Sequence, residues 1–329
     1  MSLGVLHVGL GPIGATIVRL VAARRDLHSV AAVDLDPAKT GRDLGDVSGL
    51  GRALRVPIAT ELARTVRASR PDVVVLSTGS SLASVLPDLE AVLKLKVPVV
   101  STTEELAYPV RSTARLLKRL DAAARRSRVA VLGTGVNPGF AMDALPVTLT
   151  AACARVDAIE VDRVQDARTR RLPFQQKIGA GLTVDEFQVR AARGQVRHVG
   201  LAQSIAMIAD AVGWKLDRIT DEVAPKVATE AVSSGDVKVE RGRVSGLIQD
   251  GVGYCRGKAL VRLHMEAYLG APKAYDAVRI HGDPPLTMRI EGGIPGDLVT
   301  AAVVVNAIPR VLQAPPGLRT MRDFVLRVR

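Results

Sequence analysis

The stretch VLHVGLGPIGATIVRLVAARRDLHSVAAVD, residues 5–34, decides the fold of the first part of the chain. A short apolar run at 5–8 leads into the turn GLGPIG at 9–14. A segment with apolar residues at helical spacing follows, and a second apolar run ends at Asp34. A G-x-G-x-x-G spacing alone is weak evidence, but a preceding strand, a following helix and an acid about twenty residues on are typical of a dinucleotide-binding turn. The alternative is a structural glycine turn in some other α/β protein.

Each residue of this turn has a physical task in binding a dinucleotide. Gly9 permits the tight turn, Gly11 lets a pyrophosphate approach the backbone, and Gly14 lets the helix pack closely on the strand. The helix opens at Pro12 and Ile13, so that its free amides and the positive end of its dipole face the phosphates. We therefore expect these five residues to bind the cofactor.

The acid at the end of the second apolar run selects between dinucleotides. Asp34 can accept hydrogen bonds from both hydroxyls of the adenosine ribose, which suits NAD, and it would repel the 2′-phosphate of NADP. Just downstream, Lys39 and Arg42 can offset that repulsion, although each is also typical of a solvated loop. We expect NAD to be slightly favoured and leave the use of NADP open.

Composition excludes several other classes of protein. The chain has 329 residues, enough for two domains, and it is 47% apolar and 24% charged without a low-complexity tract. Its formal net charge of +12 comes largely from arginines spread along expected helices, and only 3% of its residues are aromatic. Stacking platforms for nucleic-acid bases are therefore missing, and we expect no nucleic-acid partner. A positive field would also attract an anionic cofactor.

Cysteine and histidine usage indicates a cytoplasmic protein without a metal site. Cys153 and Cys255 lie far apart, as reduced thiols of a cytoplasmic protein often do, and the five histidines form no HxH or HExxH cluster. No signal segment precedes the first expected strand, and no apolar stretch approaches the length of a membrane span. We expect no metal and no membrane partner.

Strands and helices are expected to alternate as far as residue 135. The strand runs are apolar throughout, as in a parallel sheet covered on both faces, which predicts an α/β fold with a doubly wound Rossmann sheet. Strands are expected at 4–9, 29–34, 72–78, 97–101 and 128–132, and helices at 12–25, 59–69, 81–95, 104–126 and 139–153. The loop Ser77-Thr78-Gly79-Ser80-Ser81 leaves the strand at 72–78 beside the expected nicotinamide half of the site, although its hydroxyls are equally suited to cap the next helix.

The pattern changes near residue 136. Segments of alternating polarity, together with a helix near 201–212, predict a second α+β domain with a mixed or antiparallel sheet. We expect one face of that sheet to pack on helices and the other to meet a second subunit. We therefore expect a dinucleotide-binding domain at 1–135, completed by a helix and tail at 297–329. The second domain, at 136–296, is expected to bind the substrate and to form the dimer.

Two strand ends carry candidate catalytic residues. STTEELAYP, at 101–109, contains Glu104 and Glu105, which also fit capping boxes with Ser101 and Thr102. We expect Glu105 to cap and Glu104 to project into the site, where its carboxylate can stabilise a cationic amine and move its proton. The second strand end is followed by GTGVNPGF, at 133–140. Its Asn137 can bind the nicotinamide amide or the substrate, or it can simply shape a turn.

The chain resembles the dihydrodipicolinate reductase-like dehydrogenases, and most closely the group of 2,4-diaminopentanoate dehydrogenase and native amine dehydrogenases. The matching motifs cover most of the sequence: GLGPIG, VDLDPAKTGRDLG, STTEELAYP, GTGVNPGFAMDALP, LPFQQKIGAGL, HVGLAQSIAMIADAVGW and GIPGDLVTAAVVVNAIPRVLQAPPGLRTM. The resemblance implies a two-domain subunit, a homodimer, and reversible oxidative deamination of an amine, or reductive amination of a ketone or aldehyde with ammonia. It also implies that the family's essential glutamate is Glu104.

For the substrate pocket we expect Phe140, Met142 and Phe174 to form an apolar wall that excludes water from an iminium. The HHxxK and PSGTA motifs of true dihydrodipicolinate reductase are absent from the sequence. Two other functions stay open. One is another hydride-transfer enzyme of this fold, such as a dihydrodipicolinate reductase-like or an amino-acid or homoserine-type dehydrogenase, which a lysine acting in the site, Lys177 or Lys226, would favour. The other is a non-catalytic NAD(P)-binding sensor.

Overall fold

The computed structural model describes residues 2–325 and 327. The chain divides into two compact units, Met1–Phe140 with Pro295–Arg329, and Ala141–Ile294. The division expected from the sequence has its boundaries at 135 and 297, and the roles expected for the two domains stay predictions.

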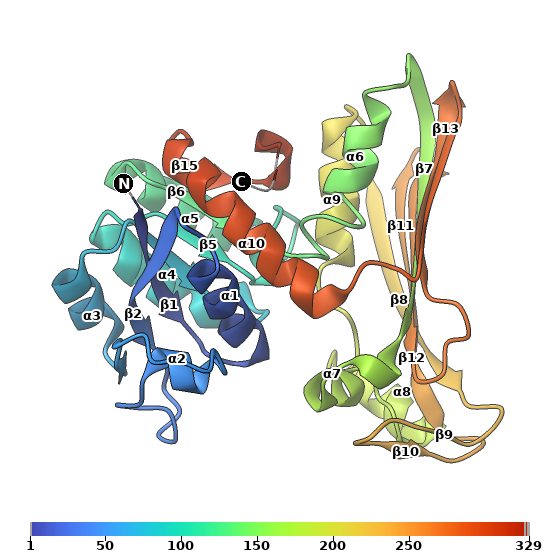
Figure 1. Ribbon diagram of the computed structural model, residues 1–329. Helices are drawn as coiled ribbons and strands as arrows, with labels where there is room; N and C mark the ends of the chain where they lie inside the picture. The colour runs from blue at the N-terminus through green and yellow to red at the C-terminus, as the bar shows by residue number, and fades with distance from the viewer. Residues whose placement is uncertain (1, 326, 328–329) are drawn as a thin grey trace. The chain divides into compact units, whose positions relative to one another are not determined.

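The first unit is built on a parallel sheet of seven strands in the order β15-β6-β5-β4-β1-β2-β3 (Figure 1). Every neighbouring pair in it is parallel. The strands are β1 (Leu3–Val8), β2 (Leu27–Val33), β3 (Ile58–Ala59), β4 (Val73–Leu76), β5 (Val99–Ser101), β6 (Ala130–Gly133) and β15 (Gly317–Arg319). The order reverses beside β1, which confirms the expected doubly wound sheet.

Helices cover both faces of this sheet. α1 (Pro12–Ala22) packs against α10 (Gly296–Gln313), and α4 (Leu82–Lys94) packs between α3 (Leu62–Ser69) and α5 (Ala114–Ser127). A short α2 (Leu44–Val47) follows β2. The prediction of one continuous helix at 104–126 is wrong. This segment forms a 3₁₀ turn, η1 (Glu104–Leu106), and then α5, with a gap between them. Pro109 lies in that gap, where a proline both lacks the amide donor and restricts the preceding residue.

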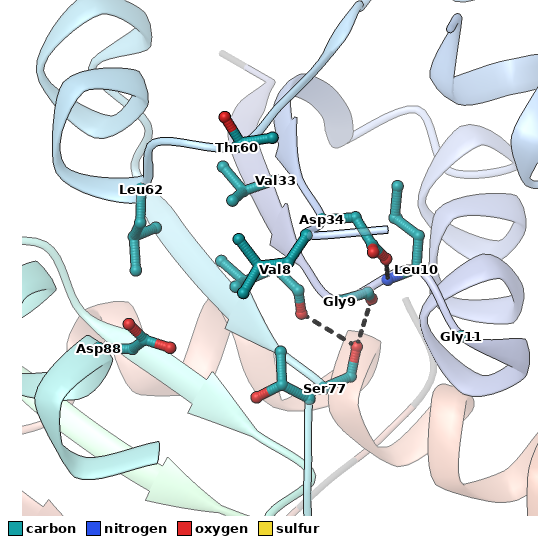
Figure 2. Close-up of a pocket in the computed structure, with 12 residues that line it drawn as sticks. Val8, Gly9, Leu10, Gly11, Val33, Asp34, Thr60, Leu62, Ser77 and Asp88 are labelled. Atoms are coloured by element: carbon teal, nitrogen blue, oxygen red, sulfur yellow. Dashed lines mark hydrogen bonds between the residues drawn. The ribbon is translucent and has the colours of Figure 1, made fainter. Parts of the chain in front are cut away.

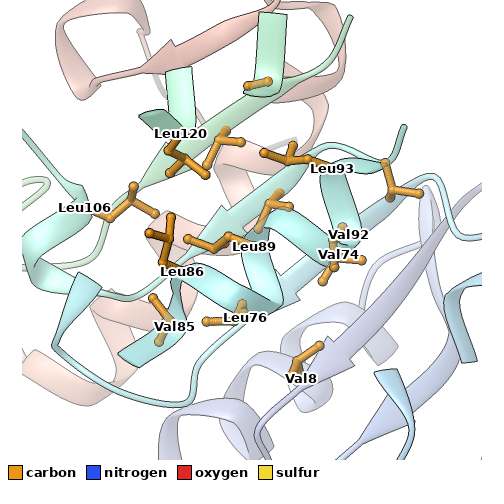
Figure 3. Close-up of a cluster of buried hydrophobic side chains, with 14 of the residues drawn as sticks. Val8, Val74, Leu76, Val85, Leu86, Leu89, Val92, Leu93, Leu106 and Leu120 are labelled. Atoms are coloured by element: carbon orange, nitrogen blue, oxygen red, sulfur yellow. The ribbon is translucent and has the colours of Figure 1, made fainter. Parts of the chain in front are cut away.

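The core on the α4 side of the sheet explains why α4 is stable despite a proline in its interior. Leu89 and Val92 are 0% exposed and pack with Leu76 and Leu120 from the sheet and from α5 (Figure 3). Complete burial of one such leucine contributes about 2 kcal/mol relative to exposure. The buried face of α4 thus packs against neighbours on two other elements, β4 and α5.

The second unit is built on a sheet of six strands in the order β14-β13-β7-β12-β11-β8, beside a small β9–β10 hairpin. Only the β7–β12 pair is parallel, which confirms the expected mixed sheet. The strands are β7 (Arg155–Asp166), β8 (Arg218–Val227), β9 (Val232–Ser233), β10 (Lys238–Val239), β11 (Val244–Cys255), β12 (Lys258–Tyr268), β13 (Tyr275–Asp283) and β14 (Leu286–Glu291).

The helices of this unit lie on one face of its sheet (Figure 1). They are α6 (Ala144–Thr150), α7 (Leu172–Lys177), α8 (Val184–Ala192) and α9 (Leu201–Ala211), with a 3₁₀ turn η2 (Ala167–Thr169). Gly251 and Gly253 of β11 face α9, because a Cβ on either would lie within 2.8 Å of Ile205. The alternate positions of β11 therefore point to the opposite face, which no helix of the described residues covers. We call this opposite side the open face.

Several elements of the second unit differ from expectation. The helix expected at 139–153 is confined to α6, while β8, α7 and α8 were not expected at all. The sequence did hold a signal for α8: Thr183 and Glu186 form a capping box, with Thr183 Oγ1 accepting the Glu186 amide at 3.1 Å. Among the described residues, no helix combines the length and apolar character needed to cross a membrane.

Candidate functional site

A cavity of about 340 Å³ lies in the first unit, at the edge where the parallel strands of the sheet end (Figure 2). It is lined by residues at or just after the ends of β1, β2, β3 and β4 and by residues of α3 and α4. These residues are Val8, Gly9, Leu10, Gly11, Val33, Asp34, Leu35, Thr60, Leu62, Ser77, Thr78 and Asp88. Ligands of open α/β sheets bind at this edge, next to the point where the strand order reverses.

The glycine turn has the geometry that a dinucleotide requires. Gly9 has φ +84°, a left-handed conformation that favours glycine. A Cβ on Gly14 would lie 2.0 Å from the Gly9 carbonyl oxygen, so only glycine fits where α1 meets β1. A Cβ on Gly11 would meet no atom within 4 Å, which leaves room there for a pyrophosphate.

The start of α1 is ready to bind an anion. Gly11 is its N-cap and has no side chain to cap the helix, and Pro12 occupies the first turn, which Ile13 continues. The first amides of a helix have no partner within it, and the helix dipole places positive charge there. The residues present therefore fit a dinucleotide.

Asp34 is held in place by three donors. Its Oδ2 accepts the Leu10 amide at 2.7 Å and the Lys39 ammonium at 3.2 Å, and its Oδ1 accepts the Asp36 amide at 2.9 Å. Partial burial alone would raise the pKa of Asp34, but the two backbone donors and Lys39 outweigh it and lower that pKa below its ordinary value. An ionised Asp34 can still accept a hydrogen bond from a ribose hydroxyl, because each carboxylate oxygen has two lone pairs.

The loop after β4 ties the cavity to the glycine turn. Ser77 Oγ donates to the Gly9 carbonyl at 2.8 Å, and Thr78 lines the cavity. The Gly79 carbonyl accepts the Thr103 hydroxyl at 2.9 Å. The alternative role for this loop, hydroxyl caps for the next helix, is wrong, since Ser81 is the N-cap of α4 and makes no side-chain cap bond.

The two glutamates after β5 differ in their surroundings. Glu105 Oε2 accepts the Leu82 amide at 2.8 Å, so Glu105 caps α4, a neighbouring helix, rather than its own. The expected capping boxes with Ser101 and Thr102 are therefore wrong: Thr103 is the N-cap of η1 and makes no side-chain cap bond. Glu104 is half-buried at the start of η1, at the same edge of the sheet as the cavity.

The segment after β6 lies beside that of β5. The Thr134 amide donates to the Ser101 carbonyl at 2.8 Å, and the Val136 amide donates to Thr300 Oγ1 at 3.2 Å. Asn137 is 7% exposed and precedes Pro138 through a cis peptide bond. Glu104 and Asn137 thus follow neighbouring strands of one sheet.

The three residues expected for the apolar wall belong to different units. Phe140 is half-buried at the end of the first unit, whereas Met142 and Phe174 belong to the second. Met142 is 0% exposed, and the Arg170 guanidinium lies 4.0 Å from the centre of the Phe174 ring. The contribution of these three residues to a substrate pocket stays a prediction.

Outside the stretch 5–34, sequence reasoning missed four residues that line the cavity: Leu35, Thr60, Leu62 and Asp88. Each looks like an ordinary surface or helix residue in the sequence, and only the tertiary fold brings it to the cavity. Of the two lysines that an alternative enzyme would need, Lys226 binds Glu266 Oε2 at 3.0 Å. No group of three or more histidine, cysteine or acidic residues in the described chain is placed to hold a metal ion.

A doubly wound sheet with this glycine turn and this acid defines the class of dinucleotide-dependent dehydrogenases. Comparison with known proteins narrows the class. Residues 140–328 match the model of the 2,4-diaminopentanoate dehydrogenase C-terminal domain. The chain is 32% identical to 2,4-diaminopentanoate dehydrogenase of Acetoanaerobium sticklandii, over 97% of this chain and 92% of that protein. The chain belongs to the 2,4-diaminopentanoate dehydrogenase family.

Two further relatives agree with this assignment. An amine dehydrogenase of Streptomyces virginiae is 25% identical over 97% of this chain and 95% of its own length. The structure of an amine dehydrogenase from Mycobacterium smegmatis superposes with a TM-score of 0.90 at 24% identity, covering 100% of this chain and 98% of that one, and so has the same fold. The expected class is confirmed: the chain is a nicotinamide-dependent dehydrogenase of the amine type.

Proposed function

We propose that the protein catalyses the reversible, NAD(P)-dependent oxidative deamination of an amine, or in reverse the reductive amination of a ketone or aldehyde with ammonia. The observation that supports this most directly is the commitment of Glu105 to the α4 cap. Since Glu105 serves the fold, we assign the role at the substrate to Glu104, one residue earlier at the same edge of the sheet.

The residues that would hold the cofactor are those of the cavity and the turn. The pyrophosphate would bind to Gly9, Gly11 and Gly14 and to the free backbone amides of the helix start at Pro12 and Ile13. The ribose would bind to Asp34. Ser77, Thr78, Gly79 and Asn137 would continue the site towards the nicotinamide, which would supply or accept the hydride.

The cofactor preference depends on a balance of charges around Asp34. The Lys39 ammonium lies 3.2 Å from Asp34 and 3.3 Å from Asp36, so the single cation is shared between two carboxylates. It therefore offsets only part of their repulsion of a 2′-phosphate. This favours NAD over NADP in our proposal, without excluding NADP as a second cofactor.

Glu104 would act on the substrate nitrogen. In the direction of amination, ammonia and a carbonyl compound form an iminium, and the Glu104 carboxylate stabilises its positive charge and moves its protons. Water must be excluded, because hydrolysis of the iminium returns the carbonyl compound. Phe140, Met142 and Phe174 are the residues that we propose for this task.

The experiment that tests this function compares two matched substitutions. Purified protein is assayed with NADH or NADPH, a panel of ketones and aldehydes, and ammonia, following absorbance at 340 nm. Glu104→Gln should lower kcat by at least about 100-fold and leave NADH binding unchanged, since general acid–base groups contribute about that much. Glu105→Gln should retain most of the activity, because a glutamine oxygen can still accept the Leu82 amide.

Two results would refute the proposal. One is turnover that does not require ammonia or an amine, which would point to a different hydride-transfer reaction. The other is full activity of Glu104→Gln. Cofactor binding without turnover of any amine or carbonyl compound would favour the sensor.

The proposal includes a homodimer located in the cytoplasm. Both signs of charge occur on the open face, so two copies related by a twofold axis can complement each other. Cys153 and Cys255 are both free thiols, as is usual in a reducing compartment.

A further inference from the structure

The end of the cavity that lies farthest from the glycine turn has a chemistry of its own. Figure 2 shows the Asp88 carboxylate facing the cavity beside Leu62, on the side away from Gly11. Asp34 lies between these two ends (Figure 2). If Gly11 is next to the pyrophosphate and Asp34 is next to the ribose, the end with Asp88 is where the base of the dinucleotide lies.

The walls at this end suit a flat aromatic ring. Val33 and Leu62 line the cavity, and Leu35, which also lines it, is 79% exposed, an unusual position for a leucine. An apolar side chain at the rim of a cavity gains burial when a ligand covers it. Apolar walls bind any purine about equally well, however, and do not distinguish one base from another.

Asp88 supplies the polar group that does distinguish bases. It belongs to the second turn of α4 and is half-buried. Asp34 and Asp88 are the two acidic residues that line the cavity. Asp34 has three donors from the protein, whereas Asp88 has no hydrogen-bond or ion-pair partner among the residues that the structure describes. Burial raises the pKa of Asp88 above its ordinary value, since no donor offsets its desolvation.

An ionised carboxylate only accepts hydrogen bonds, so the ligand must bring the donor. At the 6-position, adenine has an amino group, a donor, and hypoxanthine has an oxo group, an acceptor. A carboxylate opposite that position therefore attracts adenine and repels hypoxanthine, which leaves two acceptors facing each other.

We propose that Asp88 accepts a hydrogen bond from the 6-amino group of the cofactor's adenine and so selects adenine dinucleotides. The proposal rests on the proposed function, because it assumes that the cavity holds the adenosine half of a dinucleotide. It adds a polar residue on α4 to a cavity whose other polar residues come from strand ends and the glycine turn.

The test measures binding rather than turnover. Dissociation constants of NADH and of reduced nicotinamide hypoxanthine dinucleotide, which differ at the 6-position of the purine, are determined by fluorescence titration. The wild type should bind NADH at least about tenfold more tightly, the effect of one hydrogen bond to a charged group. Asp88→Asn should reduce this ratio to below about threefold, since an amide can both accept from an amino group and donate to an oxo group.

Two further variants separate this effect from general ones. Asp88→Ala should weaken NADH binding and leave binding of the hypoxanthine analogue unchanged or improved. Asp46→Asn removes the same charge from an exposed position on α2 and should keep the wild-type ratio. Thermal unfolding of every variant checks that the fold is intact.

The outcomes are distinguishable. Equal binding of the two dinucleotides to the wild type, or an unchanged ratio in Asp88→Asn, overturns the role of Asp88 and leaves the proposed function standing. Failure of the wild type to bind either dinucleotide overturns the cofactor site itself, and the role of Asp88 with it.

Discussion

Gly11 and Gly14 lie three residues apart in one turn, yet a methyl group would meet different surroundings at each. At Gly14 it would lie 2.0 Å from the backbone oxygen of Gly9, and neither β1 nor α1 can move aside without losing its packing. At Gly11 it would point into open space, where the proposed pyrophosphate lies. One glycine is therefore required by the fold and the other by the ligand.

This difference predicts opposite phenotypes for two alanine substitutions. Gly14→Ala should lower the free energy of unfolding by about 3 kcal/mol, the upper range for overpacking. Gly11→Ala should keep wild-type stability and weaken NADH binding by at least about tenfold. Denaturant unfolding and fluorescence titration measure the two effects. A Gly11→Ala variant that binds NADH normally would contradict a pyrophosphate at this position.

His7 is a buried histidine near the end of β1. It is 2% exposed, its Nε2 lies 2.9 Å from Ser29 Oγ, and its Nδ1 has no partner among the described residues. Burial lowers the pKa of His7 from 6.5 to about 3, so the folded protein holds this histidine neutral. The unfolded chain binds a proton below pH 6.5, and this contribution to stability is present above pH 6.5 and is lost as the pH falls towards 3.

We therefore expect His7→Asn to flatten the acid side of the stability profile. Between pH 6 and pH 4, the free energy of unfolding of the wild type should fall more steeply than that of the variant, by up to about 1.4 kcal/mol per pH unit. His28→Asn, at an exposed position on β2, is the matched control and should run parallel to the wild type. Parallel profiles for His7→Asn would show that His7 does not contribute to acid sensitivity.

At the level of secondary structure, the sequence predicts elements best where local pattern and tertiary environment agree. β1, α1 and β2 follow directly from apolar spacing and the glycine turn. β15 has only three residues, Gly317–Arg319, and is a strand because β6 offers it an edge, which no local pattern reveals. Likewise Glu105 caps a helix that starts 23 positions earlier in the chain, so its role depends on how β5 lies beside α4.

The second unit contains a pair of buried charges that joins three segments. Arg163 of β7 and Asp276 of β13 are 1% and 3% exposed, and Arg163 Nη1 lies 2.5 Å from Asp276 Oδ1. Their remaining polar atoms bind the backbone of Ile294, which accepts from Arg163 at 2.9 Å and donates to Asp276 at 2.6 Å. The pair thus fixes the point at which the chain leaves this unit.

Removal of one member of this pair should be costly. Arg163→Met leaves the Asp276 carboxylate buried without its cation, and we expect a loss of about 3–5 kcal/mol in the free energy of unfolding. The double variant Arg163→Met/Asp276→Asn should recover part of the loss, because asparagine can still accept the Ile294 amide without a charge. Arg155→Met, an exposed residue of the same strand, should change stability little. A single variant as stable as the control would refute this role for the pair.

For the molecule as a whole, the sequence predicts those parts of the site that are formed by residues close together in the chain, and misses those formed by residues far apart. Gly9 and Asp34 form their part of the cavity through adjacent elements, so the motif suffices to find them. Leu62 and Asp88 come from helices much later in the chain, and only the packing of α3 and α4 on the sheet brings them in. Motif reasoning therefore finds the phosphate and ribose ends of the cavity and misses the end assigned here to the base.

The open face of the second unit carries a network of opposite charges. His264 Nδ1 lies 2.7 Å from Asp250 Oδ1, and Arg279 Nη2 lies 2.6 Å from Asp162 Oδ2. Partial burial would lower the pKa of His264, but Asp250 and the neighbouring Glu266 outweigh burial and raise it. Apolar side chains such as Ile248, half-buried and directly opposite Glu266 across β11 and β12, lie among these charges. We propose this face for the dimer because its charges of both signs can meet those of a second copy related by a twofold axis.

The dimer proposed for this face can be tested by introducing one charge. Ile248→Arg should raise the dissociation constant of the dimer by at least about 100-fold, because it replaces a half-buried apolar side chain of the proposed interface by a long charged one on both copies at once. Val189→Arg is the matched control: Val189 is 52% exposed on α8, away from the open face, and its variant should sediment like the wild type. Analytical ultracentrifugation at micromolar concentration separates the two species. A monomeric wild type, or an Ile248→Arg variant that remains dimeric, would mean that the charges of the open face are balanced within one chain and do not serve a second copy.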